Sequence, residues 1–128
     1  MRENELSTII LDIAFNIHNK LGPGLFESVY EEIMAFELIN TYELSIKRQK
    51  AIPVIWKGNE LALGFRTDII VENKVIVELK SIEMLRPVHS KQVLTYLRIT
   101  GMHLGLLINF NEALLKNGIK RIVNNLED

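Results

Sequence analysis

The 128 residues of this chain are 48% hydrophobic and 24% charged, enough apolar material for one compact core but too little length for two ordinary domains. The absence of cysteine excludes disulfides, thiolate metal sites and thiol catalysis, so any chemistry must come from carboxylates, lysine, histidine, hydroxyls or amides. A formal net charge of −1 excludes a general coat for nucleic acid, because that binding mode needs a cationic face.

The N-terminal segment resembles neither a signal peptide nor a membrane span. Residues 1–5 are largely polar or charged, Asp12 interrupts the apolar stretch that follows, and no apolar run approaches the roughly 18 residues that a span requires. We therefore expect a soluble, cytoplasmic protein that does not bind membranes, with a single domain over residues 1–128.

Two amphipathic helices are predicted at the start of the chain. Apolar residues recur at spacings of three and four from Leu6 to Leu21, with Ser7 or Asn4 as the expected cap. The sequence Leu-Gly-Pro-Gly over 21–24 ends this helix, because proline disfavours helical geometry in the residue before it. A second helix is expected from about Leu25 to Thr41.

A three-stranded antiparallel meander should follow. Runs rich in β-formers cover residues 46–56, 61–65 and 69–71, with Lys57-Gly58-Asn59 as the separating turn. Residues 74–80 form a further predicted strand, joined to its predecessor by a tight turn over residues 72–74.

The rest of the chain predicts one more helix and one or two strands. Pro87 can begin a helix that runs to Thr100 and ends at Gly101. The apolar run 104–108 is typical of a strand buried on both faces. For residues 118–123 we favour an edge strand over a helix. The expected fold is α/β, a mixed central sheet with the first two helices on one side and the third on the other.

The hairpin between Asp68 and Lys80 has the most informative geometry. A three-residue turn over 72–74 sets Val71 opposite Val75 and, further along, Asp68 opposite Glu78. Opposed residues share a sheet face, so these two carboxylates would repel one another unless a cation lay between them. Because side chains alternate along a strand, Lys80 shares the face of Glu78 while Leu79 points into the core.

Two carboxylates and one ammonium on a single face suit metal-assisted hydrolysis of a phosphodiester. The carboxylates can hold a hard cation such as Mg²⁺, and lysine supplies positive charge where the attacking hydroxide and the phosphate are most negative. The alternative is an ordinary solvated strand surface, on which a Glu-x-Lys pattern is common.

Polar residues on the helices are weaker candidates. Gln92 and Tyr96 are four residues apart and lie on one helix face, where they can contact water, sugar or phosphate or simply form a polar surface. With Gly24 as the N-cap, Glu27 falls at the third position of the second helix, where the helix dipole alone favours a carboxylate. The three histidines form no metal-ligand pair and are expected to be packing or surface residues: His18, His89 and His103.

Four motifs together give a specific resemblance. Residues 24–30, Gly-Leu-Phe-Glu-Ser-Val-Tyr, resemble the signature of the GxxExxY protein family, a group assigned to the PD-(D/E)XK nuclease superfamily. Similar landmarks follow in order: Arg66-Thr67-Asp68, Glu78-Leu79-Lys80, Gln92 to Leu97, and Gly105 to Phe110. Thr67 stands where the superfamily name has proline, and the acid itself is retained.

The resemblance implies a restriction-endonuclease-like αβββαβ core and a role for each matched position. Asp68 and Glu78 correspond to the metal-binding acids, with the Leu79 backbone carbonyl beside them. Glu27 corresponds to the first acidic motif and is a further candidate ligand, and Lys80 to the motif lysine. The remaining catalytic candidates correspond to the QxxxY element of the RecB and lambda-exonuclease branch: Gln92 and Tyr96.

The expected activity is hydrolysis of DNA, with RNA as the second choice, assisted by Mg²⁺ or Mn²⁺. Phosphate contacts are expected from basic residues near the first strand and the third helix: Lys47, Arg48, Lys50, Arg86, Lys91 and Arg98. Two alternatives remain open at this point. One is a module that binds nucleic acid or protein on the same fold without turnover, and the other is a structural role that includes a homo-oligomer.

Overall fold

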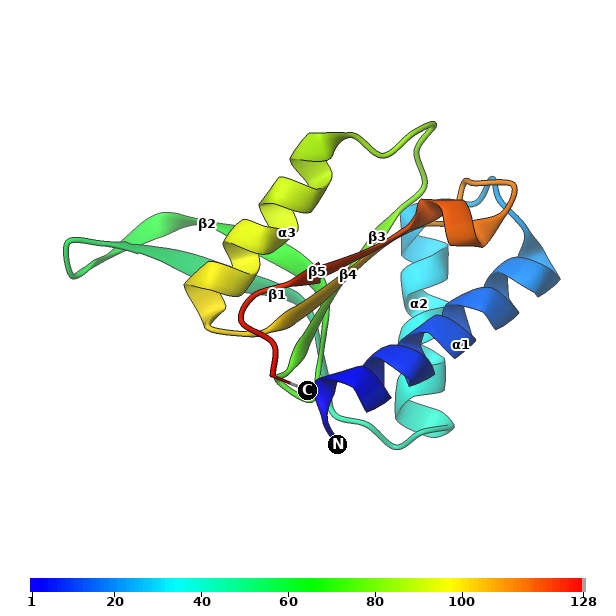
Figure 1. Ribbon diagram of the computed structural model, residues 1–128, viewed down its shortest axis with the longest axis horizontal. Helices are drawn as coiled ribbons and strands as arrows, with labels where there is room; N and C mark the ends of the chain where they lie inside the picture. Colours follow the sequence, from blue (N-terminus) through cyan, green and yellow to red (C-terminus); the bar gives the residue numbers. More distant parts are fainter. Residues whose placement is uncertain (128) are drawn as a thin grey trace.

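The computed structural model describes residues 1–127, apart from the side chains of residues 62 and 63. Its centre is a five-stranded mixed sheet in the order β1-β2-β3-β4-β5, with α1 and α2 on one face and α3 on the other (Figure 1). The elements, in chain order, are α1 (Glu3–Leu21), α2 (Glu27–Asn40), β1 (Ile46–Trp56), β2 (Asn59–Val71), β3 (Val75–Lys80), α3 (Pro87–Thr100), β4 (Leu104–Asn109), the 3-10 helix η1 (Leu115–Gly118) and β5 (Ile119–Val123).

The sheet topology confirms the prediction. β1, β2 and β3 form the antiparallel meander, α3 crosses over so that β4 runs parallel to β3, and β5 returns antiparallel as an edge strand. Every residue of β4 is buried, as expected for a strand covered on both faces. The short helix η1 was not predicted.

Alternation along β2 and β3 divides the core into two layers. Ile69, Val77 and Leu79 pack with α1 and α2 in the larger layer, whereas Ile70 and Ile76 pack with Leu97 of α3 in the smaller one. This division is the one that the period-two pattern of the strands requires.

Both predicted caps of the first two helices are wrong. α1 begins at Glu3, ahead of both predicted caps, Ser7 and Asn4, and the backbone N–H of its N-cap Arg2 donates to the Glu5 carboxylate at 3.1 Å. α2 has Phe26 rather than Gly24 at its N-cap, so Glu27 is its first residue and not its third. The third helix matches its prediction, with Pro87 at its start and Gly101 in the left-handed conformation after its end.

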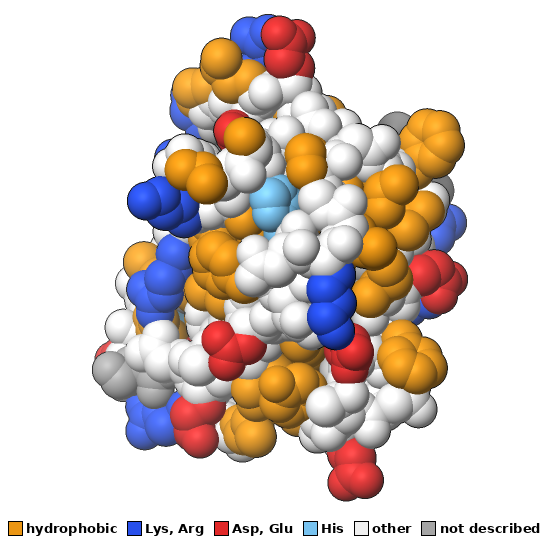
Figure 2. Space-filling view, turned by 90° about the vertical axis from the view of Figure 1, so that its right-hand side faces the viewer, with side chains coloured by type: hydrophobic (Ala, Val, Ile, Leu, Met, Phe, Trp, Pro, Cys, Tyr) orange, Lys and Arg blue, Asp and Glu red, His pale blue; other side chains and the backbone are white. Residues whose placement is uncertain are grey.

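Charge is mixed over the side of the molecule on which α1, α2 and η1 lie. Acidic, basic and hydrophobic side chains are interspersed there, without a continuous field of either sign (Figure 2). None of the helices within residues 1–127 combines the length and apolar character needed to cross a bilayer.

Candidate active site

The hairpin of β2 and β3 carries the predicted acidic pair. Val71 pairs with Val75 and Ile69 with Val77, as the three-residue turn required, and continuation of this register brings Asp68 across from Glu78. Beyond Ile69, hydrogen bonds from backbone N–H groups to the two carboxylates connect the strands in place of backbone-to-backbone bonds. The N–H of Asp68 donates to Glu78 Oε1 at 3.1 Å, and the N–H of Leu79 donates to Asp68 Oδ2 at 2.8 Å.

The two carboxylates are electrostatically coupled. Glu78 is only 6% exposed, and this burial is the main cause that raises its pKa to about 8. The negative charge of Asp68 raises it further, while the hydrogen bond from the Asp68 amide and the positive charge of Lys80 act in the opposite direction. Near neutral pH the site therefore carries a buried carboxyl that keeps its proton unless a positive charge is brought in.

A pocket of about 470 Å³ lies beside Asp68. Asp68, Leu79 and Lys80 line it from the sheet, and the first turn of α2 lines it from the other side with Glu27 and Ser28. The structure thus brings Glu27 to the same pocket as Asp68 and Lys80, as the prediction required. Glu27 reaches it from the first helical position, with an exposed side chain.

Gln49 of β1 is a site residue that the sequence did not reveal. Its side-chain amide donates to Asp68 Oδ1 at 3.3 Å and to Glu31 Oε1 at 2.7 Å, so it links β2 to α2. Its φ of +49° is in the left-handed region, which is uncommon for a residue other than glycine. The Gln49 carbonyl accepts a hydrogen bond from Arg66 Nη1 at 3.1 Å, which helps to hold this strained backbone.

Lys80 ends β3 beside the pocket and is half-buried. The Phe110 N–H donates to its carbonyl at 2.9 Å, and in the parallel ladder Lys80 lies next to Asn109. The fully buried Asn109 side chain both donates to the Ile82 carbonyl and accepts from the Ile82 N–H. The chain that leaves Lys80 is therefore fixed to the end of β4, and this fixes the backbone from which Lys80 projects.

Tyr30, the last residue of the 24–30 motif, holds the loop that precedes α2. Its hydroxyl donates to the Gly22 carbonyl at 2.7 Å and accepts from the Leu25 N–H at 3.2 Å. Its ring stacks on Phe110 with centroids 4.3 Å apart. Tyr30 therefore connects the start of α2 to the end of β4, and its role is to position the wall of the pocket that carries Glu27.

The two α3 candidates are placed differently. Tyr96 is half-buried, its ring stacks on Phe65 of β2 with centroids 3.8 Å apart, and burial followed by the charges of Glu78 and Asp68 raises its pKa. Tyr96 therefore lies close to the acidic pair. Gln92 is exposed and makes no hydrogen bond to the described residues, so its role stays a prediction.

Thr67, which stands at the proline position of the motif, is fully buried. Within the part of the chain that the structure describes, its hydroxyl has no hydrogen-bond partner. The residue before Asp68 is thus a packing residue here.

Of the predicted phosphate contacts, Arg48 already has partners. Its guanidinium bonds Glu31 Oε2 through Nε at 3.0 Å and through Nη2 at 2.9 Å, and it also contacts Glu32 Oε1 at 3.1 Å. The other predicted contacts are exposed and remain predictions: Lys47, Lys50, Arg86, Lys91 and Arg98.

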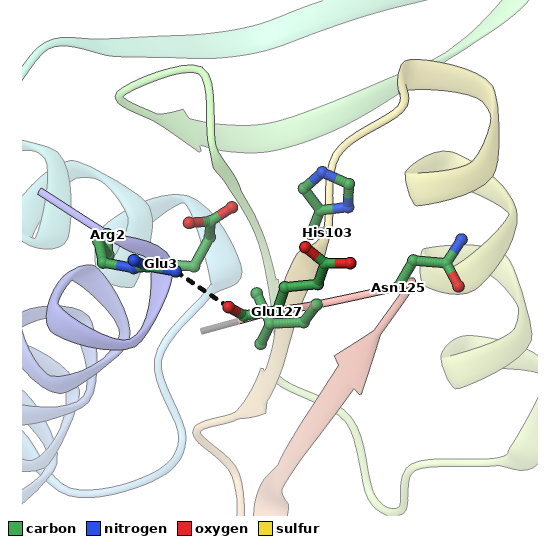
Figure 3. A pocket seen from close by; sticks show the side chains of 6 residues that line it. Arg2, Glu3, His103, Asn125 and Glu127 are labelled. Atoms are coloured by element: carbon green, nitrogen blue, oxygen red, sulfur yellow. Dashed lines mark hydrogen bonds between the residues drawn. The ribbon is translucent and has the colours of Figure 1, made fainter.

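The histidines have structural surroundings. His18 Nε2 lies 2.7 Å from the Glu112 carbonyl oxygen, and His89 Nδ1 accepts from the Arg86 N–H at 2.9 Å at the start of α3. His103 lines a separate pocket of about 400 Å³ between the start of α1 and the C-terminal segment, where Arg2 Nη2 donates to the Glu127 carbonyl (Figure 3). None of the predicted catalytic residues lines that pocket.

The donor set at the acidic pair fits a divalent cation. Mg²⁺ prefers oxygen ligands and is commonly held by only one or two carboxylates with waters and substrate phosphates. Asp68 and Glu78 supply that number. Among residues 1–127 no group of three acidic or histidine side chains converges to form a fuller protein cage.

A mixed sheet with this strand order, carrying an acidic pair and a lysine where β2 and β3 diverge, is a restriction-endonuclease-like arrangement. The family model of the PD-(D/E)XK nuclease superfamily matches residues 4–122, and the chain belongs to that superfamily. No curated protein and no solved structure gives a significant match. Membership of the GxxExxY family stays a prediction.

Proposed function

We propose that this protein is a divalent-metal-dependent nuclease that hydrolyses phosphodiester bonds of DNA, with RNA as the second choice, from a single domain over residues 1–128. The observation that carries the proposal is the pair of hydrogen bonds that ties the two acids across the hairpin, from the Asp68 N–H to the Glu78 carboxylate and from the Leu79 N–H to the Asp68 carboxylate, with Lys80 at the same end of β3. Two adjacent acids, of which Glu78 is buried, repel one another in the absence of a cation, so this arrangement favours a cation site over a purely structural role.

Asp68, Glu78 and the Leu79 carbonyl would hold Mg²⁺ or Mn²⁺. Glu27 lines the same pocket but forms no three-acid group with this pair, so it would contact the ion through a water ligand. When bound, the ion would polarise a phosphoryl oxygen and acidify a water. Its positive charge would also offset the burial and repulsion that keep Glu78 protonated.

The chain's own groups would act on the substrate in distinct ways. The Lys80 ammonium stabilises negative charge that develops on the attacking oxygen and the phosphate. Tyr96 carries its phenolic proton at neutral pH, as an unperturbed tyrosine does, and burial raises its pKa further, so it can donate a hydrogen bond to a phosphate oxygen. Gln49 holds Asp68 in place through its side-chain amide, and Gln92 is the candidate for orienting a water.

The proposal is tested by incubating purified protein with end-labelled single- and double-stranded DNA and RNA. We expect cleavage of at least one substrate with Mg²⁺ or Mn²⁺ and none with excess chelator. Protein that binds one of these substrates but cleaves none with either ion would contradict the proposal. That outcome would identify a binding module on the nuclease fold.

A further inference from the structure

The β1–β2 hairpin extends beyond the rest of the sheet as a two-stranded arm. β2 pairs with β3 only over residues 69–71, whereas its pairing with β1 continues out to Trp56 and Asn59. In Figure 1 the hairpin projects from one side of the molecule, past α3. The base of the arm is the candidate site itself, since Gln49 of β1 contacts Asp68 of β2.

The arm carries a charge opposite to that of the whole chain. Residues 49–67, the part of the hairpin beyond its pairing with β3, contain one acidic residue, Glu60, and three basic ones: Lys50, Lys57 and Arg66. The arm's formal charge is thus +2, and the rest of the chain must carry −3 to give the total of −1. This surplus is suited to a polyanion, whereas Arg48, just before the arm, is already paired with Glu31 and Glu32.

The tip of the arm exposes apolar surface that the fold does not use. Trp56 is 64% exposed, Ile55 62% and Leu61 44%. Trp56 is also the chain's one tryptophan. A large aromatic at the end of a basic ribbon is the combination used to bind single strands, in which cations contact the phosphates and an aromatic ring stacks on an unpaired base.

We propose that the β1–β2 arm binds a single-stranded stretch of the nucleic acid that enters the candidate active site, with Trp56 stacked on a base. This inference rests on the proposed nuclease function and identifies the surface that would bind the nucleic-acid substrate. Trp56 lies seven residues along β1 from Gln49, a reach of roughly 23 Å at strand spacing.

A second copy of this chain is the competing occupant of the arm, and two observations disfavour it. Pro53 removes a backbone donor from the free edge of β1, and the pairing shifts register between Pro53 and Val54, so the strand offers a poor edge for another strand. Two arms with a charge of +2 would also repel each other.

The test uses the intrinsic fluorescence of Trp56 in chelator, so that cleavage plays no part. Titration with an oligothymidylate of about 20 nucleotides should quench this fluorescence. In a binding assay with a labelled oligonucleotide, Trp56→Ala should weaken affinity by roughly 5- to 100-fold, while Trp56→Phe should retain most of it. The control is Phe36→Ala, which removes an aromatic of similar exposure (61%) from α2 and should leave affinity unchanged.

Charge is tested with a matched pair of double variants. Lys50→Ala with Lys57→Ala should weaken binding and reduce the slope of log affinity against log salt by about 2. Lys116→Ala with Lys120→Ala removes the same charge from η1 and β5, at the other edge of the sheet, and should change neither quantity.

The inference is overturned if the oligonucleotide leaves Trp56 fluorescence unchanged, or if Trp56→Ala binds the oligonucleotide with wild-type affinity. It is also overturned if Trp56→Ala weakens the binding of duplex as much as the binding of single strands. A light-scattering mass that falls on Trp56→Ala would assign the arm to self-association instead. Quenching without any metal-dependent cleavage would support the arm and contradict the proposed function. Metal-dependent cleavage without any change in Trp56 fluorescence would support the proposed function and contradict the role of the arm.

Discussion

Asp68 has two kinds of partner in the site. Its carboxylate accepts hydrogen bonds from the Leu79 N–H and the Gln49 amide, and its charge acts on the pKa of Glu78. The Leu79 hydrogen bond at 2.8 Å needs one acceptor oxygen, which asparagine retains, whereas a cation site needs the charge. Replacement by asparagine therefore removes the charge and the longer Gln49 bond while it keeps the bond from Leu79.

For Asp68→Asn we expect a fall in Mn²⁺ affinity larger than the roughly 10- to 100-fold that loss of an outer partner costs a metal site. Without metal, the variant should be more stable than wild type by about 1 kcal/mol near pH 9, above the pKa of about 8 of Glu78, because the repulsion across the hairpin is relieved. Calorimetric titration and urea denaturation measure the two quantities. Unchanged Mn²⁺ affinity would exclude Asp68 as a ligand.

Glu78 should make the metal-free protein less stable as pH rises. In the unfolded chain this carboxyl loses its proton near 4.5, whereas in the native protein it keeps the proton up to a pKa of about 8. Between these values the native state binds more protons, so the free energy of unfolding falls as pH rises from about 4.5 to about 8 and levels off above it.

Denaturation in chelator across this pH range tests the expectation, with Glu78→Gln as the matched variant. Glutamine cannot ionise, so the variant should lose this component of the pH dependence. Saturating Mg²⁺ should also reduce it in the wild type, because a bound cation favours the ionised form. Identical pH profiles for wild type and Glu78→Gln would show that Glu78 does not titrate as its burial requires.

At the scale of elements, the close contact of α3 with β4 depends on Gly105. A Cβ at this position would meet Val93 Cγ1 at 2.5 Å, and Val93 is itself only 1% exposed. Gly105→Ala should therefore cost about 1–3 kcal/mol of stability by overpacking. Because α3 carries Tyr96, its displacement should also lower cleavage.

A double-mutant cycle with Val93→Ala provides the control. Removal of the Val93 methyl groups makes room for the new Cβ, so the double variant should lose less stability than the sum of the two single variants, by about 1 kcal/mol. Strictly additive losses in urea denaturation would show that α3 does not rest on this contact.

The elements also show what the sequence could predict. Helical and strand periods predicted the layers, and the short turn over 72–74 fixed the register that brings Asp68 across from Glu78. The longer β1–β2 hairpin behaved differently. If the pairing of Trp56 with Asn59 at the tip continued without a break, Gln49 would lie opposite Arg66. The irregularity after Pro53 shifts the register by two residues, so Gln49 contacts Asp68 instead.

Other site features depend on tertiary contacts that periodicity does not encode. Glu31 is seven per cent exposed only because Arg48 and Gln49 bind its two oxygens, and Tyr30 acts through a loop eight residues earlier in the chain. The α2 cap was misjudged because Gly24 is a favourable cap residue in isolation, whereas the loop held by Tyr30 delays the helix to Glu27.

At the scale of the whole molecule, the site lies where three parts meet. The acidic pair is placed by the β2–β3 hairpin, one pocket wall by the first turn of α2, and the basic arm begins at Gln49. A negatively charged body with a positively charged arm would orient a polyanion along the arm and towards the cation site, where its phosphates are least repelled.

The central claim is that Lys80, with Asp68 and Glu78, cleaves phosphodiesters, and its most direct test is the cleavage rate of Lys80→Ala against that of the wild type. Lys80 acts mainly on charge that develops in the transition state, so the variant should lose roughly 100- to 1,000-fold in kcat. Its thermal stability and Mn²⁺ affinity should stay nearly unchanged. A folded Lys80→Ala variant that binds Mn²⁺ and cleaves at the wild-type rate would contradict the account.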